Sequence, residues 1–420
     1  MQHWTRRQLL LAGLALPLLP RRVQAATGRV IVLGGGFAGA TAARAIKQQA
    51  PQVQVILVEA KTQYATCPFS NLALVGGYPL AGLHQGYQRL HALGVEQVSE
   101  TAELIDSERQ ELRLSSGLRL RYDRLLLAPG IDMRWDAIDG YSPALAEQLP
   151  HAWQAGAQTR LLQRQLQAMA DGQTLIISVP ANPYRCPPGP YERASLIAQY
   201  LKQHKPRSKL LILDAKDSFS KQSLFQQHWQ QHHAQRIEWI GRAADGQVVA
   251  LDAKRRELHT EFGQRHRAAV INLIPPQQAA AVARRSNLTD ASGWVPIDPQ
   301  TFACLQAPHI YAIGDACIAA PMPKSAFSAH AQAQVAVQAL LNEWLGLELP
   351  AVGLQNTCYS LLQTGQAVSI GAHYQVQQGL LQEVPGSAHL SPLAGDLALR
   401  AHEANVGQGW YQQICRAIWG

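Results

Sequence analysis

Residues 29–39 read RVIVLGGGFAG, a short apolar run followed at once by a glycine-rich turn. The apolar run is typical of a buried parallel strand, and residues 40–50 after the turn favour a helix. Three glycines of the turn fit the pattern G-x-G-x-x-G: Gly34, Gly36 and Gly39. In this pattern the first glycine permits a tight turn, the second lets the backbone approach a pyrophosphate, and the third lets helix and strand pack closely.

An acidic residue follows at the place where a ribose-binding residue is expected. Residues 52–58 predict a second strand, which ends in Glu59, 20 residues after Gly39. A carboxylate at this place accepts hydrogen bonds from ribose hydroxyls, while the helix N-terminus faces the phosphates. The segment therefore predicts a dinucleotide-binding domain of the Rossmann type.

Two later segments indicate which dinucleotide is bound. Residues 125–130 read LLLAPG and residues 310–315 read IYAIGD, each an apolar strand that ends in a turn. With the glycine-rich turn, they resemble the signatures of the FAD/NAD-linked reductase superfamily. The resemblance implies FAD as the cofactor, with Asp315 hydrogen-bonded to the flavin ribityl chain. It also assigns the neighbouring turn residues to FAD binding: Pro129, Gly130 and Gly314.

The second Rossmann-like domain that this superfamily usually contains is altered here. Residues 174–179 and 209–213 predict its first two strands, but the turn between them, residues 180–190, reads PANPYRCPPGP. Proline has no N–H to offer a phosphate and restricts the backbone, so this turn cannot cradle a pyrophosphate. We therefore expect this domain to have kept its fold and lost nicotinamide binding.

The length and composition are consistent with several packed domains. The chain has 420 residues, of which 47% are hydrophobic and 16% charged, enough for two or three domains with buried cores. We predict an α/β fold with two Rossmann-like domains of the FAD/NAD-linked reductase type and a small C-terminal domain. The FAD-binding domain is expected to be discontinuous, over residues 26–150 and 285–345. The second Rossmann-like domain is expected at residues 151–284 and a C-terminal partner-interface domain at residues 346–420.

The first 25 residues have the pattern of an export signal. Residues 5–11 read TRRQLLL, residues 9–19 form an apolar run, and residues 23–25 read VQA, a small-x-Ala cleavage pattern. This pattern predicts a twin-arginine signal, which would export the folded protein to the periplasm. The alternative is a membrane anchor, but the run is shorter than the roughly 20 apolar residues that a spanning helix needs. No later segment reaches that length, so stable membrane insertion is not expected.

The positive charge does not indicate a nucleic-acid partner. Residues 1–25 contain four arginines and no acidic residue, and therefore hold half of the formal net charge of +8. The rest is mildly basic, and it has no run of Lys and Arg with interleaved aromatic residues of the kind that binds nucleic acid.

Four blocks carry a closer resemblance. The chain from about residue 29 onward is similar, in the order of all its blocks, to the flavoprotein subunit of flavocytochrome c sulfide dehydrogenase. The blocks are YATCPFSN at residues 64–71, RCPPGPYERAS at 185–195, GDACI with PMPKS at 314–325, and NTCYS at 356–360.

The resemblance assigns roles to three of the six cysteines. It implies that FAD is attached covalently, through a thioether from Cys67 to the flavin 8α carbon. It also implies a redox-active disulfide between Cys186 and Cys358, beside the flavin ring, and places Lys324 among the cofactor-binding residues. Hydrosulfide attack on one disulfide sulfur would leave a persulfide and a thiolate, from which two electrons pass to FAD. The sequence does not indicate which sulfur is attacked.

Glu192 has two interpretations. It lies six residues after Cys186, near the expected start of a helix at Tyr191. It could move the proton that the substrate or a thiol releases, or it could only stabilise the helix dipole. The remaining cysteines receive no catalytic role, although Cys317 is expected to be a buried neighbour of the cofactor; they are Cys304, Cys317 and Cys415.

No metal or haem site is predicted. His228 and His232 have the spacing H-x-x-x-H, which places them on one helix face, but no third ligand is evident in their Gln-rich surroundings. We therefore interpret them as part of a solvated helix face. The motif C-x-x-C-H is absent, so this chain holds no c-type haem by that motif.

The function expected from the resemblance is that of a periplasmic flavoprotein that oxidises sulfide to zero-valent sulfur or polysulfide. It would pass electrons to a separate cytochrome c subunit, in a heterodimer. One alternative is a sulfide:quinone oxidoreductase, which usually has amphipathic C-terminal helices; the Gly-Gln-Gly sequence at residues 407–409 is expected to weaken such a helix. Another alternative is a non-catalytic flavoprotein that activates a sulfur-oxidising complex.

Overall fold

The structure is a computed structural model that describes residues 28–420. The predicted export signal at residues 1–25 lies outside the described residues. Within residues 28–420, no helix combines the length and the apolar character that crossing a membrane requires.

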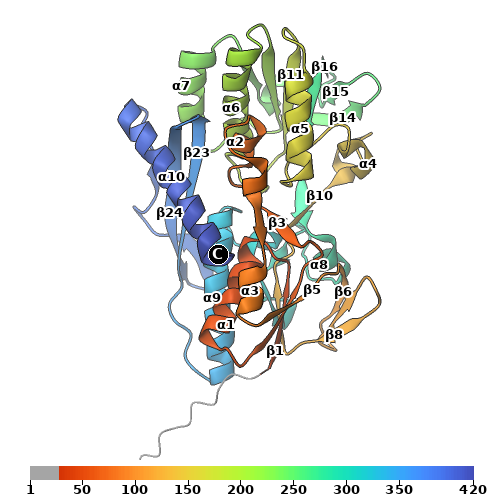
Figure 1. Cartoon of the computed structure of the whole chain (residues 1–420), viewed down its shortest axis with the longest axis vertical. Coiled ribbons are helices and arrows are strands. Elements are labelled where there is room, and N and C mark those ends of the chain that lie inside the picture. Colours follow the sequence, from red (N-terminus) through yellow and green to blue (C-terminus); the bar gives the residue numbers. More distant parts are fainter. Residues whose placement is uncertain (1–27) are drawn as a thin grey trace, which may run out of the picture.

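The first sheet carries the predicted dinucleotide-binding unit. Five of its six strands run parallel, and the edge strand β20 is antiparallel to β21. The spatial order is β20 (Ala303–Cys304), β21 (Ala307–Ala312), β9 (Arg124–Leu127), β1 (Arg29–Leu33), β2 (Gln54–Val58) and β5 (Val95–Val98). The apolar run of β1 is central, and Val30, Ile31 and Val32 are fully buried. Helices α1 (Phe37–Gln49) and α9 (Ala326–Leu345) pack together beside this sheet (Figure 1).

The second sheet confirms the predicted second Rossmann-like unit. Its four strands are all parallel, in the order β13 (Ile237–Ile240), β12 (Lys209–Asp214), β11 (Thr174–Val179) and β17 (Val270–Leu273). The predicted strands at residues 174–179 and 209–213 correspond to β11 and β12. The accompanying helices are α5 (Ala157–Ala168), α6 (Gly189–His204) and α7 (Gln222–His233).

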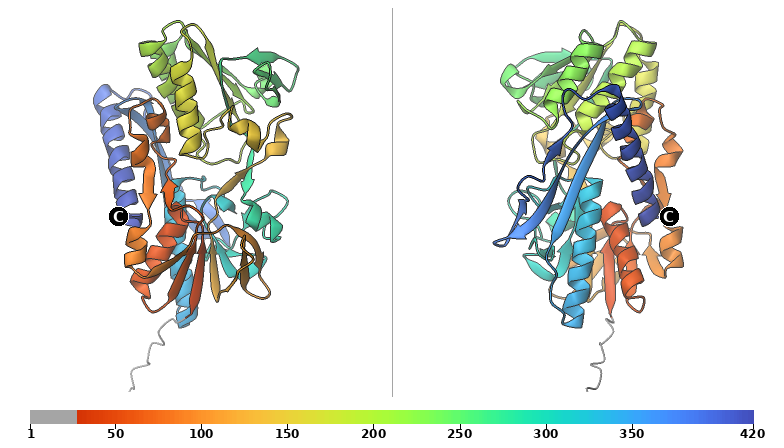
Figure 2. Two further views of the ribbon diagram at one scale, coloured as in Figure 1. Left: turned by 45° about the vertical axis from the view of Figure 1, so that its right-hand side comes forward. Right: turned by 90° about the vertical axis from the view of Figure 1, so that its left-hand side faces the viewer.

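The C-terminal part joins the two sheets. It consists of β23 (Gly353–Gln363), β24 (Gln366–Gln377), β25 (Leu380–Glu383), β26 (His389–Leu390) and the long helix α10 (Leu397–Ile418). Strand β23 contacts both α6 and α9, and α10 packs on β24 and β23 and reaches α1 (Figure 2). The expectation that residues 407–409 weaken a C-terminal helix is wrong, because α10 is continuous through them. A Cβ at Gly407 would lie 2.9 Å from the Tyr359 Cβ, so this glycine lets α10 approach β23 closely.

Shorter elements complete the fold. The small strands are β3 (Gln63–Ala65), β4 (His84–Gly86), β6 (Ala102–Asp106), β7 (Glu111–Leu114), β8 (Arg119–Arg121), β10 (Ile131–Met133), β14 (Val248–Asp252), β15 (Glu257–Thr260), β16 (Arg265–Arg267), β18 (Gln277–Ala279), β19 (Val295–Pro296) and β22 (Cys317–Ile318). The short helices are α2 (Ser70–Leu74), α3 (Gln88–Ala92), α4 (Pro143–Ala146) and α8 (Ala281–Arg285). The 3₁₀ helices are η1 (Leu80–Leu83), η2 (Trp135–Ala137), η3 (Arg242–Ala244) and η4 (Gly314–Ala316).

Candidate active site

A cavity of about 670 Å³ lies where the first sheet, the second Rossmann-like unit and the C-terminal hairpin meet. This volume is in the range that small-molecule and cofactor sites occupy. Most of the sequence-predicted site residues line it: Gly34, Gly36, Glu59, Cys67, Pro129, Gly130, Cys186, Glu192, Gly314, Asp315 and Cys358. The fold thus brings together residues that lie up to about 320 positions apart in the chain.

The glycine-rich turn has the geometry that its pattern predicts. Gly34 has φ of +99°, and a Cβ there would lie 2.3 Å from the Ala128 carbonyl oxygen. A Cβ at Gly39 would lie 1.9 Å from the Gly34 carbonyl oxygen, so this glycine allows α1 to pack against the turn. Gly35 N–H donates to Glu59 Oε2 at 2.9 Å, which places the carboxylate beside the turn. The start of α1, Glu59 and the turn therefore form one surface of the cavity.

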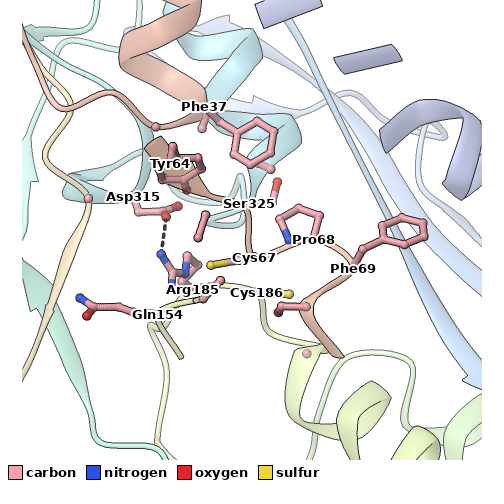
Figure 3. Close-up of a pocket in the computed structure, with 18 of the residues that line it drawn as sticks. Phe37, Tyr64, Cys67, Pro68, Phe69, Gln154, Arg185, Cys186, Asp315 and Ser325 are labelled. Carbon is pink, nitrogen blue, oxygen red and sulfur yellow. Dashed lines mark ion pairs between the residues drawn. The ribbon is translucent and has the colours of Figure 1, made fainter. Parts of the chain in front are cut away.

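Asp315 presents a buried acceptor to the cavity. It lies in η4, directly after β21, and its Oδ1 has no hydrogen-bond partner among the described residues. Its Oδ2 lies 3.7 Å from the Arg185 Nη1, and Figure 3 shows this ion pair beside Cys67. A buried oxygen without a partner is costly, so Asp315 Oδ1 is suited to accept a hydrogen bond from a bound molecule.

Two of the predicted cofactor-binding residues, Gly39 and Lys324, do not line the cavity. Lys324 lies beneath the loop of Asp315. Its ammonium donates to the backbone carbonyls of Asp315, at 3.0 Å, and Cys317. It also lies 3.7 Å from the centre of the Trp294 ring, a cation–π contact. In this structure Lys324 supports the loop that carries Asp315.

Cys67 lies in the segment between β3 and α2, which α10 holds in place. The neighbouring Thr66 is buried, and its hydroxyl lies 2.6 Å from the Tyr411 hydroxyl on α10. Phe69, in the left-handed conformation with φ of 66°, stacks on the Tyr411 ring with centroids 4.5 Å apart. Figure 3 shows the Cys67 sulfur pointing into the cavity next to Arg185.

Cys186 and Cys358 meet the cavity from two different units. Cys186 precedes α6 in the left-handed conformation, with φ of 58°, whereas Cys358 lies on β23. Burial raises the pKa of the Cys186 thiol. A negative charge on Cys358 raises this pKa further, so the two cysteines are close enough to interact electrostatically. A Cβ at Gly189 would lie 3.0 Å from the Cys186 sulfur, which explains the glycine there. All six cysteines are free thiols in this structure, and the disulfide stays a prediction.

Glu192 faces the cavity from the first turn of α6. Burial raises the pKa of its carboxyl to about 7, against the opposing positive charge of Lys221. Hydrogen bonds from the Leu361 backbone and the Asn71 side chain lower it as well. A carboxyl with a pKa near neutrality is suited to accept and release a proton.

Three basic residues of the site were missed by the sequence analysis. Arg193 is buried and donates to Asn71 Oδ1 at 2.9 Å, to Asn272 Oδ1 at 2.7 Å and to the Ala152 carbonyl at 2.7 Å. Arg185 and Arg193 both belong to the block RCPPGPYERAS, so this sequence motif could have identified them as site residues. The third is Lys221, in a polar stretch without a motif, and nothing in the sequence pointed to it.

The acidic residue at the end of the second strand of the second unit is bound by protein groups. Asp214, at the end of β12, is fully buried. It accepts hydrogen bonds from Tyr191 at 2.5 Å and Trp239 at 3.0 Å, and pairs with Lys216 at 2.6 Å. The acid at this strand end is therefore already satisfied, which supports the predicted loss of nicotinamide binding.

The interpretation of His228 as part of a solvated helix face is wrong. His228 is buried on α7, and burial lowers the pKa of its imidazole to about 3, whereas His232 is exposed. The apolar positions of α7 pack against α6, and His228 shares their face. Among residues 28–420, no group of three or more His, Cys, Asp or Glu side chains is arranged to hold a metal ion.

Comparison with known proteins places this site in a family. Two domain models of sulfide dehydrogenase match: the central domain of the flavocytochrome c flavoprotein chain at residues 159–275, and the flavocytochrome c sulphide dehydrogenase flavin-binding domain at residues 350–419. The pyridine nucleotide-disulphide oxidoreductase model matches residues 28–175. The sulfide dehydrogenase [flavocytochrome c] flavoprotein chain of Chlorobaculum thiosulfatiphilum is 53% identical over 45 residues, which cover 11% of this chain and 94% of that sequence. The chain belongs to the flavocytochrome c sulfide dehydrogenase flavoprotein family.

Other relatives are sulfide:quinone oxidoreductases. Mitochondrial sulfide:quinone oxidoreductase of Mus musculus is 23% identical over 312 residues, covering 73% of this chain and 69% of the relative. The solved structure of sulfide:quinone oxidoreductase from Aquifex aeolicus has a TM-score of 0.72 at 15% identity, covering 93% of this chain and 92% of that one. The predicted α/β fold with Rossmann-like units is therefore confirmed. The family to which the chain belongs is one of sulfide-oxidising flavoproteins.

The flavin-binding family match supports FAD as the cofactor, and the cavity fits it. The unpartnered Oδ1 of Asp315 would be available to accept a hydrogen bond from a ribityl hydroxyl. The crowded glycines at positions 34 and 39 would allow the close backbone approach that a pyrophosphate needs, and Glu59 would be placed to accept from a ribose hydroxyl.

Proposed function

We propose that this protein is the flavoprotein component of a periplasmic sulfide dehydrogenase, with FAD bound through Cys67 and a cytochrome c as electron acceptor. One observation carries the proposal: Cys67, Cys186 and Cys358 line a single cavity together with the glycine-rich turn and Asp315. A cofactor site and a pair of thiols in one cavity allow sulfur chemistry directly beside a redox group.

The side chains around the thiols are suited to an anionic sulfur substrate. Arg185 and Arg193 bring positive charge to the cavity wall, which attracts hydrosulfide. In the proposed reaction hydrosulfide attacks one sulfur of a Cys186–Cys358 disulfide, the S–S bond breaks, and the other sulfur leaves as a thiolate. Glu192 accepts the proton that the new persulfide releases. FAD, when bound, supplies a two-electron acceptor that can return electrons one at a time.

The acceptor distinguishes this proposal from a second candidate, a sulfide:quinone oxidoreductase. The curated relatives with that activity and the continuous helix α10 favour the second candidate. The match of both sulfide dehydrogenase domains, over the second Rossmann-like unit and the C-terminal part, favours a cytochrome partner. Export by the twin-arginine route rests on residues 5–11 and 23–25 alone.

An anaerobic sulfide assay tests the function and the acceptor together. The purified, FAD-loaded protein is mixed with sulfide and offered oxidised cytochrome c and a soluble quinone in parallel. We expect sulfide-dependent reduction of cytochrome c at a rate at least tenfold above that of the quinone. Preferential quinone reduction would identify the second candidate. No sulfide turnover with either acceptor would indicate the non-catalytic flavoprotein that activates a sulfur-oxidising complex.

The Cys67 attachment has a direct chemical test. We expect acid-precipitated protein to retain its yellow flavin, because a thioether survives denaturation, and we expect Cys67→Ala to release all flavin into the supernatant. Cys317→Ala is the matched control, since Cys317 is a buried cysteine near Asp315 that does not line the cavity. Free flavin in the supernatant of the unaltered protein would contradict the covalent link.

A further inference from the structure

A buried lysine lies behind the strand that carries Cys358. Lys221 directly precedes α7 and is only 4% exposed, and it does not line the cavity. Its ammonium donates to the Cys358 carbonyl at 2.8 Å, to Ser360 Oγ at 2.7 Å and to the Val368 carbonyl at 3.5 Å. Within the described part of the chain, no carboxylate forms an ion pair with it inside 4.0 Å. A buried cation held only by neutral groups lacks a counter-charge.

The geometry of β23 places the Cys358 side chain on the side of this ammonium. Residues two apart in a strand point to the same face, so Asn356, Cys358 and Ser360 share one face of β23. Ser360 contacts the Lys221 ammonium, and Asn356 Nδ2 lies 3.5 Å from the Cys358 sulfur. The Cys358 sulfur therefore lies next to an amide donor, on the face of β23 whose Ser360 side chain binds the ammonium.

The other ionisable groups around Lys221 are poorly suited to balance its positive charge. Negative charge on Cys358 is the largest electrostatic contribution that raises the pKa of Lys221, ahead of Glu192 and Cys186 on the α6 side and Glu403 on α10. Burial still lowers the pKa of Lys221 to about 8 and raises that of Glu192 to about 7. Glu403 is occupied by hydrogen bonds from Ser369 and Ser391 and by an ion pair with Arg400.

We propose that Lys221 is a positioning residue that holds the negative charge of a thiolate on Cys358. A negative charge on Cys358 interacts with the ammonium, whereas burial raises the pKa of the Cys186 thiol. The thiolate is the nucleophilic form of cysteine, so Cys358 is the reactive thiol of the reduced pair. The proposal deepens the proposed function and rests on it for the role of the pair in sulfide oxidation.

The reactivity of the Cys358 thiol can be measured without sulfide or an electron acceptor. In the FAD-loaded Cys186→Ser protein, the rate of Cys358 alkylation by iodoacetamide is followed by mass spectrometry from pH 5 to 10. An opposite charge at close range lowers a pKa by about 1 unit or more. We therefore expect Lys221→Met to slow the alkylation of Cys358 at pH 7 about tenfold. Lys221→Arg, which keeps the charge, should restore most of the rate.

Controls separate charge from folding. Lys216→Met removes another, partly buried ammonium of the same unit, which pairs with Asp214 and donates to the Pro180 carbonyl, and should leave the Cys358 profile unchanged. Where Lys221→Met does not fold, Ser360→Ala removes one anchor of the ammonium and should shift the profile in the same direction by less. An unchanged profile in Lys221→Met or Ser360→Ala, or a shift equal in Lys221→Arg and Lys221→Met, overturns the proposal. Because alkylation needs no sulfide oxidation, its outcome is independent of the acceptor assay.

Discussion

Replacement of Cys358 by serine is expected to abolish flavin reduction by sulfide, by a factor of about 10³ or more, while FAD stays bound. A serine oxygen cannot form the disulfide that hydrosulfide attacks, so the first bond of the proposed reaction is never made. The change is small in volume, and the contacts that hold β23 to Lys221 use the backbone carbonyl of residue 358 and therefore persist. The measurement is the loss of flavin absorbance after anaerobic mixing with sulfide in a stopped-flow instrument.

Cys304→Ser is the matched control for this variant. Cys304 is buried at the edge of the first sheet, near Gln306, and does not line the cavity. It should reduce at the unaltered rate. Cys186→Ser should be as inactive as Cys358→Ser, and the double variant no worse than either, because two residues that form one disulfide act as a unit. Normal flavin reduction in Cys358→Ser would remove the cysteine pair from the reaction.

Local sequence signals predicted the first unit well. The glycine-rich turn, β1 and Glu59 follow one another within about 30 residues, and each is required by contacts inside that unit. The crowding around Gly34 and Gly39 leaves no room for a side chain, so the structure requires glycine at the same positions as the sequence pattern. The proline-rich turn before α6 was informative for the same reason, because proline restricts the backbone wherever it occurs.

Residues whose role depends on distant contacts could not be predicted in this way. Lys221 belongs to the site only because β23 passes beside it, 137 residues later in the chain. His228 has the spacing of a surface pair, yet the packing of α7 buries it. Gly407 lies inside a helix because it must approach β23, a contact that no local propensity reports. Such features follow from tertiary packing, which the pattern of neighbouring residues does not encode.

Replacement of Glu192 by glutamine is expected to slow flavin reduction by sulfide by about 10²-fold, the usual contribution of a positioned general base. The carboxylate form is the base, and burial places the pKa of Glu192 at about 7. With the hydrosulfide concentration held constant, the rate of the unaltered protein should therefore rise with pH through about 7. This rise should be absent in Glu192→Gln. Glu238→Gln, an exposed position on β13, is the control and should keep it.

The same substitution should change the pH dependence of stability, with a sign that follows from the direction of the shift. A carboxyl whose pKa is raised on folding, from 4.5 to about 7, binds more protons in the native than in the unfolded state over that interval. The stability of the unaltered protein therefore falls as pH rises from 4.5 to about 7 through this group, whereas glutamine does not titrate. Thermal melting should show Glu192→Gln gaining stability relative to the unaltered protein between pH 5 and 8. A melting difference that is constant with pH, together with an unchanged rate profile, would leave Glu192 with only a structural role at the start of α6.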